Sequence, residues 1–128
     1  MREILFRGKR EDNGGWAYGS LLCYKGYSIF DEIWENFLTV QAKTIGQYTG
    51  LKDKNGKRIF EGDICRNVKT GEIVSVKWHG TMAGYVWSKR TANNKNLYDF
   101  GELFRAFDRY EIIGNIHDNP EFLEVDNG

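Results

Sequence analysis

Short runs of alternating residues, each ended by a glycine-containing turn, constrain the fold of this chain more than any other feature. Apolar residues alternate with others over residues 72–79, and Gly80 ends the run. Residues 16–22 alternate in the same way, and a glycine-containing turn at residues 12–15 precedes them. With 15 glycines and one proline in the sequence, such runs are typical of short strands joined by tight turns. The sequence therefore predicts a mainly β protein.

The spacing of these runs favours two parts. We expect a small N-terminal β-rich segment over residues 1–57, joined to a C-terminal SH3-like bent barrel over residues 58–128 that ends in a helical turn. One compact unit is the alternative. One or two short helices are also predicted, over residues 31–38 and 96–107, from apolar residues at helical spacing. An irregular edge is the alternative for residues 31–38.

Charge is balanced overall but unevenly placed. The formal net charge is zero, yet residues 66–95 carry a net charge of +5 and residues 96–128 carry −6. Basic residues in the first segment alternate with aromatic ones, and the candidates for contact with nucleic acid are Arg66, Lys69, Lys77, Lys89 and Arg90. Small barrels bind single-stranded nucleic acid through such combinations of basic and aromatic side chains. A core role for the aromatics and a protein-binding groove are the alternatives, since Lys77 and Trp78 point to opposite faces of a strand.

No catalytic, cofactor or metal site is predicted. Five residues separate Gly50 from Gly56, and Arg58 stands where a phosphate-binding loop needs Ser or Thr, so this stretch does not match that motif. The two histidines and two cysteines lack the spacing of zinc ligands. Cys23 and Cys65 are predicted to be reduced and buried. The N-terminus lacks the apolar run of a signal peptide, so we expect a cytoplasmic protein that does not bind membranes.

Four stretches of the sequence resemble the YopX family of small phage and prophage proteins. They are residues 2–7 (REILFR), residues 47–57 (QYTGLKDKNGK), residues 59–64 (IFEGDI) and residues 113–123 (IGNIHDNPEFL). The resemblance implies a phage or prophage gene, a product in the bacterial cytoplasm and a mainly β fold with an SH3-like C-terminal part. It implies no catalytic residues.

The central shared stretch is interpreted as a structural joint. Its turns are attributed to Gly50, Asn55, Gly56, Gly62 and Asp63. Asn-Gly is a strong hairpin signal because both residues tolerate a positive φ angle. Asp63 is expected to cap backbone amides.

Function is predicted to be non-enzymatic. The leading hypothesis is an accessory phage protein that binds an unknown protein partner or a second copy of itself, through Trp16, Tyr18 and Trp34. Packing of these aromatics inside the protein is the alternative. A second hypothesis is nucleic-acid binding by residues 66–95, with an affinity that falls steeply with salt. An enzyme is the third.

Overall fold

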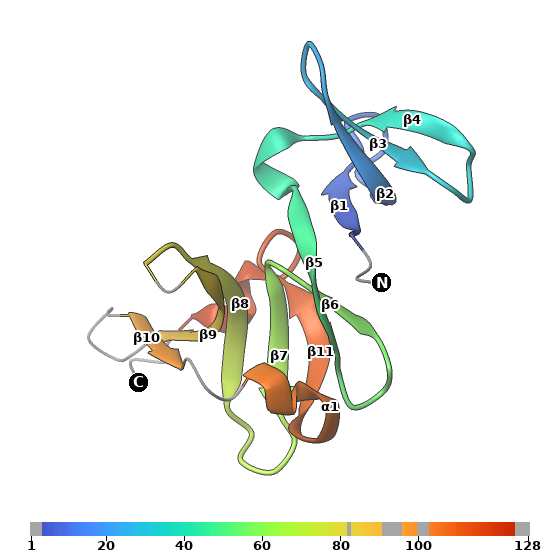
Figure 1. Ribbon diagram of the computed structural model, residues 1–128. Coiled ribbons are helices and arrows are strands. Elements are labelled where there is room, and N and C mark those ends of the chain that lie inside the picture. Colours follow the sequence, from blue (N-terminus) through green and yellow to red (C-terminus); the bar gives the residue numbers. More distant parts are fainter. Residues whose placement is uncertain (1–3, 82, 91–95, 100–102, 125–128) are drawn as a thin grey trace. The chain divides into compact units, whose positions relative to one another are not determined.

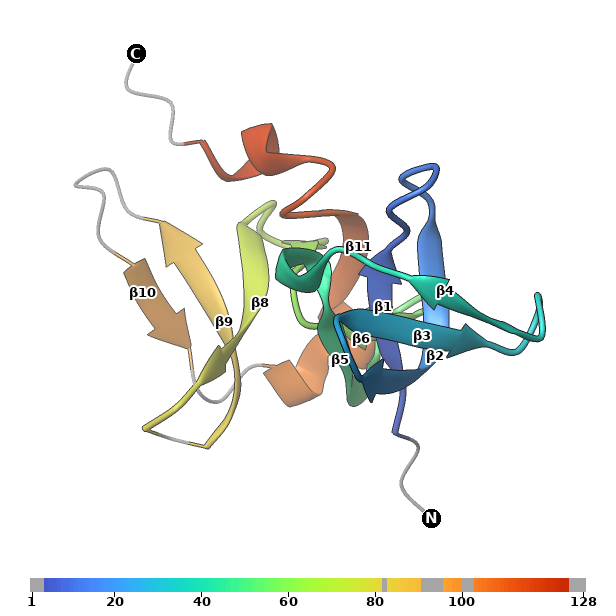
Figure 2. The same cartoon turned by 90° about the horizontal axis from the view of Figure 1, so that it is seen from above.

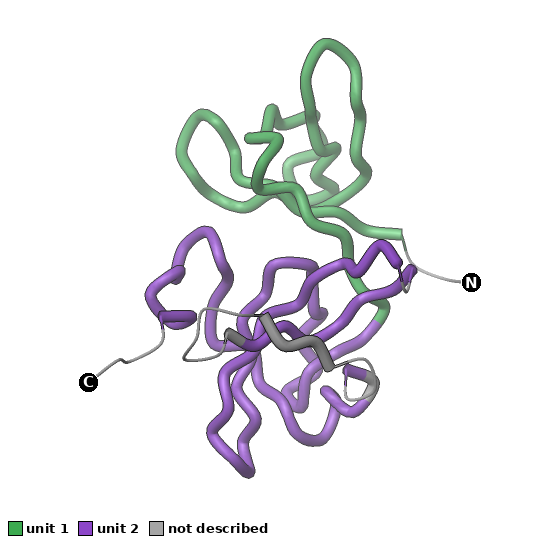
Figure 3. Tube along the Cα trace, turned by 90° about the vertical axis from the view of Figure 1, so that its left-hand side faces the viewer, with its two compact units in different colours: residues 1–50 green, residues 51–128 purple. Residues whose placement is uncertain are grey.

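A computed structural model describes residues 4–81, 83–90, 96–99 and 103–124. The protein is mainly β, with eleven strands, one short α-helix and short 3-10 helices in this described part of the chain (Figure 1). None of its helices there has the length and apolar character that a membrane crossing requires. The chain divides into two compact units, residues 1–50 and residues 51–128 (Figure 3).

The N-terminal unit is an antiparallel sheet with a small apolar core. Its elements are β1 (Phe6–Lys9), β2 (Trp16–Cys23), β3 (Tyr27–Asp31), β4 (Asn36–Thr39), the 3-10 helix η1 (Ala42–Thr44) and β5 (Gly46–Lys52), which runs across the boundary. Within this unit the strand order is β4-β3-β2-β1-β5. The side chains of Ala17, Ile29 and Val40 fill the core. The strand predicted over residues 16–22 is confirmed as β2, which pairs with β1.

The chain just beyond β4, the outer strand of this sheet, pairs with the chain just beyond β1. Beyond β4, Val40 forms an isolated bridge with Arg10, just after β1. The amide of Glu11 donates to the carbonyl of Thr39 at 3.0 Å, and that of Gln41 to the carbonyl of Lys9 at 2.8 Å. These bonds use backbone groups that an edge strand would otherwise leave open.

The C-terminal unit contains a second antiparallel sheet. Its elements are β6 (Arg58–Phe60), β7 (Asp63–Asn67), β8 (Ile73–His79), β9 (Gly84–Arg90), β10 (Asn96–Asp99), η2 (Leu103–Arg105), α1 (Ala106–Arg109), β11 (Tyr110–Asn115) and η3 (Pro120–Leu123). Five strands pair in the order β10-β9-β8-β7-β11 (Figure 2). In the described residues β10 and β11 are its two edges, and no pairing closes the sheet. The predicted barrel is thus confirmed only as a mainly β antiparallel arrangement.

One face of this sheet packs on the helical segment that precedes β11. Cys65, Val74, Val76 and Trp87 lie in one buried cluster with Leu103, Ala106 and Tyr110. The rings of Trp87 and Tyr110 lie 4.5 Å apart between centroids. Alternation along β8 explains this burial, because Val74 and Val76 point to the same face. The strand predicted over residues 72–79 is confirmed.

Two helix predictions are wrong in whole or in part. Residues 31–38 form the end of β3, a turn and most of β4. The carboxylate of Asp31 accepts the amides of Ile33 and Trp34 in this turn, and Glu35 has a φ of +51°, which a right-handed helix does not allow. Residues 96–99 form β10 rather than a helix, residues 100–102 lie outside the described part, and a helical segment begins at Leu103. Cys23 is exposed at the end of β2 instead of buried, while Cys65 is buried as predicted.

Glu61 provides a test of pH dependence. Burial raises the pKa of its carboxyl above the ordinary value of 4.5. The native state therefore holds this proton more tightly than the unfolded state, and stability falls as the pH rises through the raised pKa. We expect Glu61→Gln to raise the Tm by about 1–3 °C near pH 7 and by less near pH 4. Thermal unfolding at both values measures it, with the exposed Glu121→Gln as the control; an equal shift at both would contradict the assignment.

Candidate functional site

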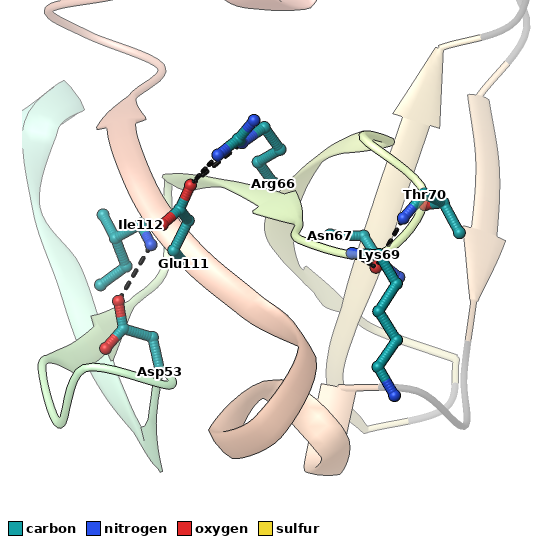
Figure 4. A network of polar contacts seen from close by, with 7 residues as sticks. All are labelled: Asp53, Arg66, Asn67, Lys69, Thr70, Glu111 and Ile112. Carbon is teal, nitrogen blue, oxygen red and sulfur yellow. Dashed lines mark hydrogen bonds and ion pairs between the residues drawn. The ribbon is translucent and has the colours of Figure 1, made fainter.

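The shared central stretch is organised by one buried carboxylate. The Oδ1 atom of Asp53 accepts the amides of Asn55 and Lys57, each at 2.9 Å, and Oδ2 accepts that of Ile112 at 3.0 Å (Figure 4). The amide of Lys54 also donates to the carbonyl of Tyr110 at 3.0 Å. Asp53 thus closes the turn and ties it to β11. Sequence inspection missed this role, although an Asp before Asn-Gly is the signal of such a turn.

The predicted turn residues occupy the joint as follows. The amide of Gly56 donates to the carbonyl of Asp53, and Gly56 has a φ of +80°, a value that only glycine adopts at little cost. Asn55 is not among the residues with positive φ, so the turn differs from the one predicted. Gly62 precedes β7, and Gly50 lies inside β5 rather than in a turn. Asp63 accepts the amide of Phe60 at 2.7 Å, which agrees with the capping role.

The predicted basic residues do not form one uniform face. Arg66, on β7, donates to the carboxylate of Glu111 on β11 (Figure 4). Lys89, on β9, pairs with Glu72 at 2.8 Å. Such exposed pairs contribute about 0–1 kcal/mol, but each places an acid beside the base, which reduces attraction for phosphate. The structure therefore brings acidic neighbours to two of the five candidates.

The other three basic candidates lie on three different elements. Lys69 is exposed in the turn between β7 and β8, and Lys77 is half-buried on β8. Arg90 ends β9, and its side chain lies outside the described residues.

Trp78 is more accessible than its strand position suggests. It shares a face with Val74 and Val76, yet 52% of its surface is exposed because the core ends before it. Its ring packs edge-on against Tyr85 with 5.1 Å between centroids. Lys77 points to the opposite face, as predicted. The end of the β8–β9 hairpin therefore exposes two neighbouring aromatic rings, while the adjacent Lys77 lies on the opposite face.

The three predicted interface aromatics all lie in the N-terminal unit. Trp16 and Tyr18 share one face of β2, where the guanidinium of Arg7 lies 4.7 Å from the Trp16 ring. Trp34 lies in the turn between β3 and β4, and 66% of its surface is exposed. The structure thus groups Trp16 with Tyr18 and places Trp34 at a separate turn.

Exposed apolar residues are concentrated in this unit. Among the described residues, twelve large apolar side chains are exposed, and eight belong to the first 50 residues. Those eight are Ile4, Tyr18, Leu22, Tyr24, Tyr27, Ile33, Trp34 and Phe37. A period-2 pattern on β2 could have indicated Leu22, which shares the face of Tyr18. The N-terminal unit therefore carries most of the exposed apolar surface.

The acidic side chains of the interior serve the backbone. Asp31, Asp53 and Asp63 are buried, and each accepts backbone amides of a nearby turn. Within the described residues, no three His, Cys, Asp or Glu side chains gather as metal ligands would. The interior carboxylates therefore have identified structural roles.

Comparisons with known proteins define the family. The model of the family described as YopX protein matches residues 5–124. The crystal structure of protein EF1440 from Enterococcus faecalis is similar, with a TM-score of 0.51 and 23% identity, over 97% of this chain and 100% of that one. At this identity the likeness concerns the fold alone. No curated protein matches the chain. Because the family model spans nearly all of the sequence and both units, the chain belongs to the YopX protein family.

Proposed function

We propose that this chain is a non-enzymatic accessory protein of phage or prophage origin, whose N-terminal unit binds another protein or a second copy of the chain. One observation carries the proposal. Eight of the twelve exposed large apolar side chains lie in the first 50 residues. Isolated surface apolar residues are normal, but such a concentration on one small sheet is typical of an interaction surface.

The buried carboxylates support the non-enzymatic part of the proposal. General acid–base catalysis needs a side chain that can reach a substrate proton. The oxygens of Asp53 accept three backbone amides, and those of Asp31 accept the amides of Tyr18, Ile33 and Trp34. These groups hold turns together, so their burial has a structural explanation. The proposed activity is therefore binding.

Sedimentation and affinity capture test this function with one pair of variants. The double variant Tyr18→Ser/Leu22→Ser alters the outer face of β2, and Phe107→Ser changes a comparably exposed ring on α1 as the matched control. We expect the wild-type chain and the control to form a concentration-dependent dimer or to retain one protein from phage-carrying cells. The double variant should do neither. A wild-type chain that stays monomeric and retains nothing contradicts the proposal.

Nucleic-acid binding is the second candidate, and the exposure of Trp78 beside Tyr85 favours it. Bases stack on such rings, at about 1–3 kcal/mol per base. We expect fluorescence anisotropy with labelled single-stranded DNA and RNA to show weak binding at about 50 mM salt that is lost at about 200 mM. Trp78→Ala and Lys89→Glu/Arg90→Glu should each reduce it, whereas Phe107→Ala should not. Absence of binding at the lower salt sinks this candidate.

The SH3-like description of residues 58–128 belongs to the same proposal. Five antiparallel strands, a short helical segment before β11 and an irregularity between Ile112 and Gly114 support it. Short strands and tight turns are typical of small bent barrels that present loops to partners.

A further inference from the structure

The turn between β3 and β4, residues 32–35, is held in place by a buried carboxylate. Asp31 is buried at the end of β3, and its Oδ1 atom accepts the amides of Ile33 at 2.9 Å and Trp34 at 3.2 Å. Its Oδ2 atom accepts the amide of Tyr18 on β2 at 3.2 Å. Glu35 completes the reversal with a φ of +51°. The turn is therefore fixed to the sheet before any partner arrives, which reduces the entropy lost on binding.

This fixed turn presents large apolar side chains to solvent. Ile33 is 90% exposed and Trp34 is 66% exposed, and Phe37, at the start of β4, is 53% exposed. None of the three belongs to the apolar core of its unit. Phe37 packs edge-on against Phe30, with 5.1 Å between ring centroids, and its other side stays open. Burial in the unit's core therefore does not account for them, whereas exposed Trp and Phe are typical anchors of protein interfaces.

A pocket adjoins the turn. It has a volume of about 420 Å³ and is lined by Arg10, Glu11, Asp12, Phe37, Leu38 and Thr39. The guanidinium of Arg10 lies over the Trp34 ring at 5.8 Å from the centroid, so the pocket and the turn form one surface. Arg10 is also paired with Asp12 through two hydrogen bonds, at 3.0 and 2.7 Å. This arrangement shows that a guanidinium can lie against Trp34 while a carboxylate holds it.

The charges of this surface are mostly negative. Four carboxylates belong to this surface, those of Glu11 and Asp12 in the pocket lining and those of Glu32 and Glu35 in the turn, against the guanidinium of Arg10. Of these four, only Asp12 has an ion-pair partner among the described residues. The hydrogen bond from Arg10 holds the pKa of the Asp12 carboxyl below its ordinary value. The other three carboxylates are exposed. Such a surface repels phosphate groups and attracts cationic side chains.

We propose that this surface, residues 32–35 with the adjoining pocket, binds a basic segment of a partner protein, with a Lys or Arg side chain against Trp34 and apolar side chains on Ile33 and Phe37. The proposal rests on the protein-binding function above and names its partner's chemistry. A cation over an exposed Trp contributes modestly by itself, but neighbouring carboxylates that complete its ion pairs add specificity. The exposed apolar side chains supply the remaining contact area.

Three labelled nonapeptides test the charge preference directly. They share two Val residues among Gly and Ser, and carry four Lys, four Gln or four Glu at the same positions. We expect the full-length protein to bind the Lys peptide at least tenfold more tightly than the Glu peptide at about 50 mM salt, with the Gln peptide between them. Fluorescence anisotropy measures all three. Equal binding of the three peptides, or no binding of any, overturns the proposal.

Variants locate the site. Trp34→Ala should weaken binding of the Lys peptide about fivefold to tenfold. Glu32→Gln/Glu35→Gln should weaken it about threefold to fivefold and flatten its salt dependence. The matched control is Tyr24→Ala, which removes an equally exposed ring at the opposite end of β3. All three changes are on exposed side chains, and circular dichroism checks the fold. An effect of Tyr24→Ala as large as that of Trp34→Ala overturns the assignment.

The other occupants of this surface give distinct results. A dimer that Trp34→Ala abolishes would assign the surface to a second copy, and single-stranded DNA binding that Trp34→Ala abolishes would assign it to nucleic acid; each overturns the proposal. If Trp34→Ala/Glu32→Gln/Glu35→Gln still retains the partner that Tyr18→Ser/Leu22→Ser loses, the protein-binding function stands and the basic-segment proposal falls. If neither variant changes capture, both fall.

Discussion

Replacing Asp53 by alanine is expected to lower the free energy of unfolding by about 3 kcal/mol. The change removes the acceptor of three backbone amides, those of Asn55, Lys57 and Ile112. The amide of Ile112 is partly buried, so the loss of its partner is costly. Asp53→Asn keeps one oxygen and should cost less. Urea denaturation measures both changes.

The matched control is an aspartate on the surface. Asp12→Ala removes a carboxylate whose ion pair with Arg10 spans only two residues of chain, and it should leave the stability nearly unchanged. Hydrogen exchange adds the location, because Asp53→Ala should speed exchange around β11 and the turn before β6 first. An Asp53→Ala protein as stable as Asp12→Ala would show that the carboxylate does not tie the joint together.

Gly19→Ala is expected to destabilise the N-terminal unit by about 3 kcal/mol or more. A Cβ atom at position 19 would stand 1.8 Å from the carbonyl oxygen of Phe30, which is a backbone atom of the neighbouring strand. No rotation of a side chain relieves such a clash, so β2 and β3 must move apart. The same two strands carry the Asp31 carboxylate that holds the β3–β4 turn. Faster hydrogen exchange over β2 and β3 measures the change.

Gly80→Ala serves as the control for this substitution. Nothing lies within 4 Å of a Cβ atom at position 80, so the variant should differ from wild type by less than about 0.5 kcal/mol. Equal stability of Gly19→Ala and Gly80→Ala would mean that β2 and β3 do not approach as closely as described.

Strand prediction succeeded where one face of a strand is buried. Residues 72–79 alternate because Val74 and Val76 contact the core while Ile73 and Lys77 lie on the other face. The same reasoning found β2. At these places the sequence alternates because every second side chain of the strand is buried.

Helix prediction failed at residues 31–38 because its premise was absent. Helical spacing of Ile33, Trp34, Phe37 and Leu38 indicates a helix only if that face is buried. Three of these side chains are exposed, so their spacing reflects no packing. The chain instead reverses at Glu35, which has a φ of +51°, and Asp31 holds the turn through two hydrogen bonds to the backbone.

Contacts between distant residues were beyond sequence reasoning. Asp53 binds the amide of Ile112, 59 residues later, and Arg66 pairs with Glu111, 45 residues later. A single sequence does not indicate which strand lies beside which. The basic segment consequently looked uniform, although the fold brings Glu111 and Glu72 beside two of its side chains.

The course of β5 bears on how the protein is made by the ribosome. The last backbone pairings of the N-terminal unit join Gly46 and Gln47 to β1, and the amide of Tyr48 donates to the carbonyl of Leu5. The partners in these pairings are therefore all synthesised before residue 51, where the second unit begins. Domains generally fold as units during synthesis, the N-terminal one first. The β3–β4 turn that Asp31 holds can thus be complete on a nascent chain, before the second sheet exists.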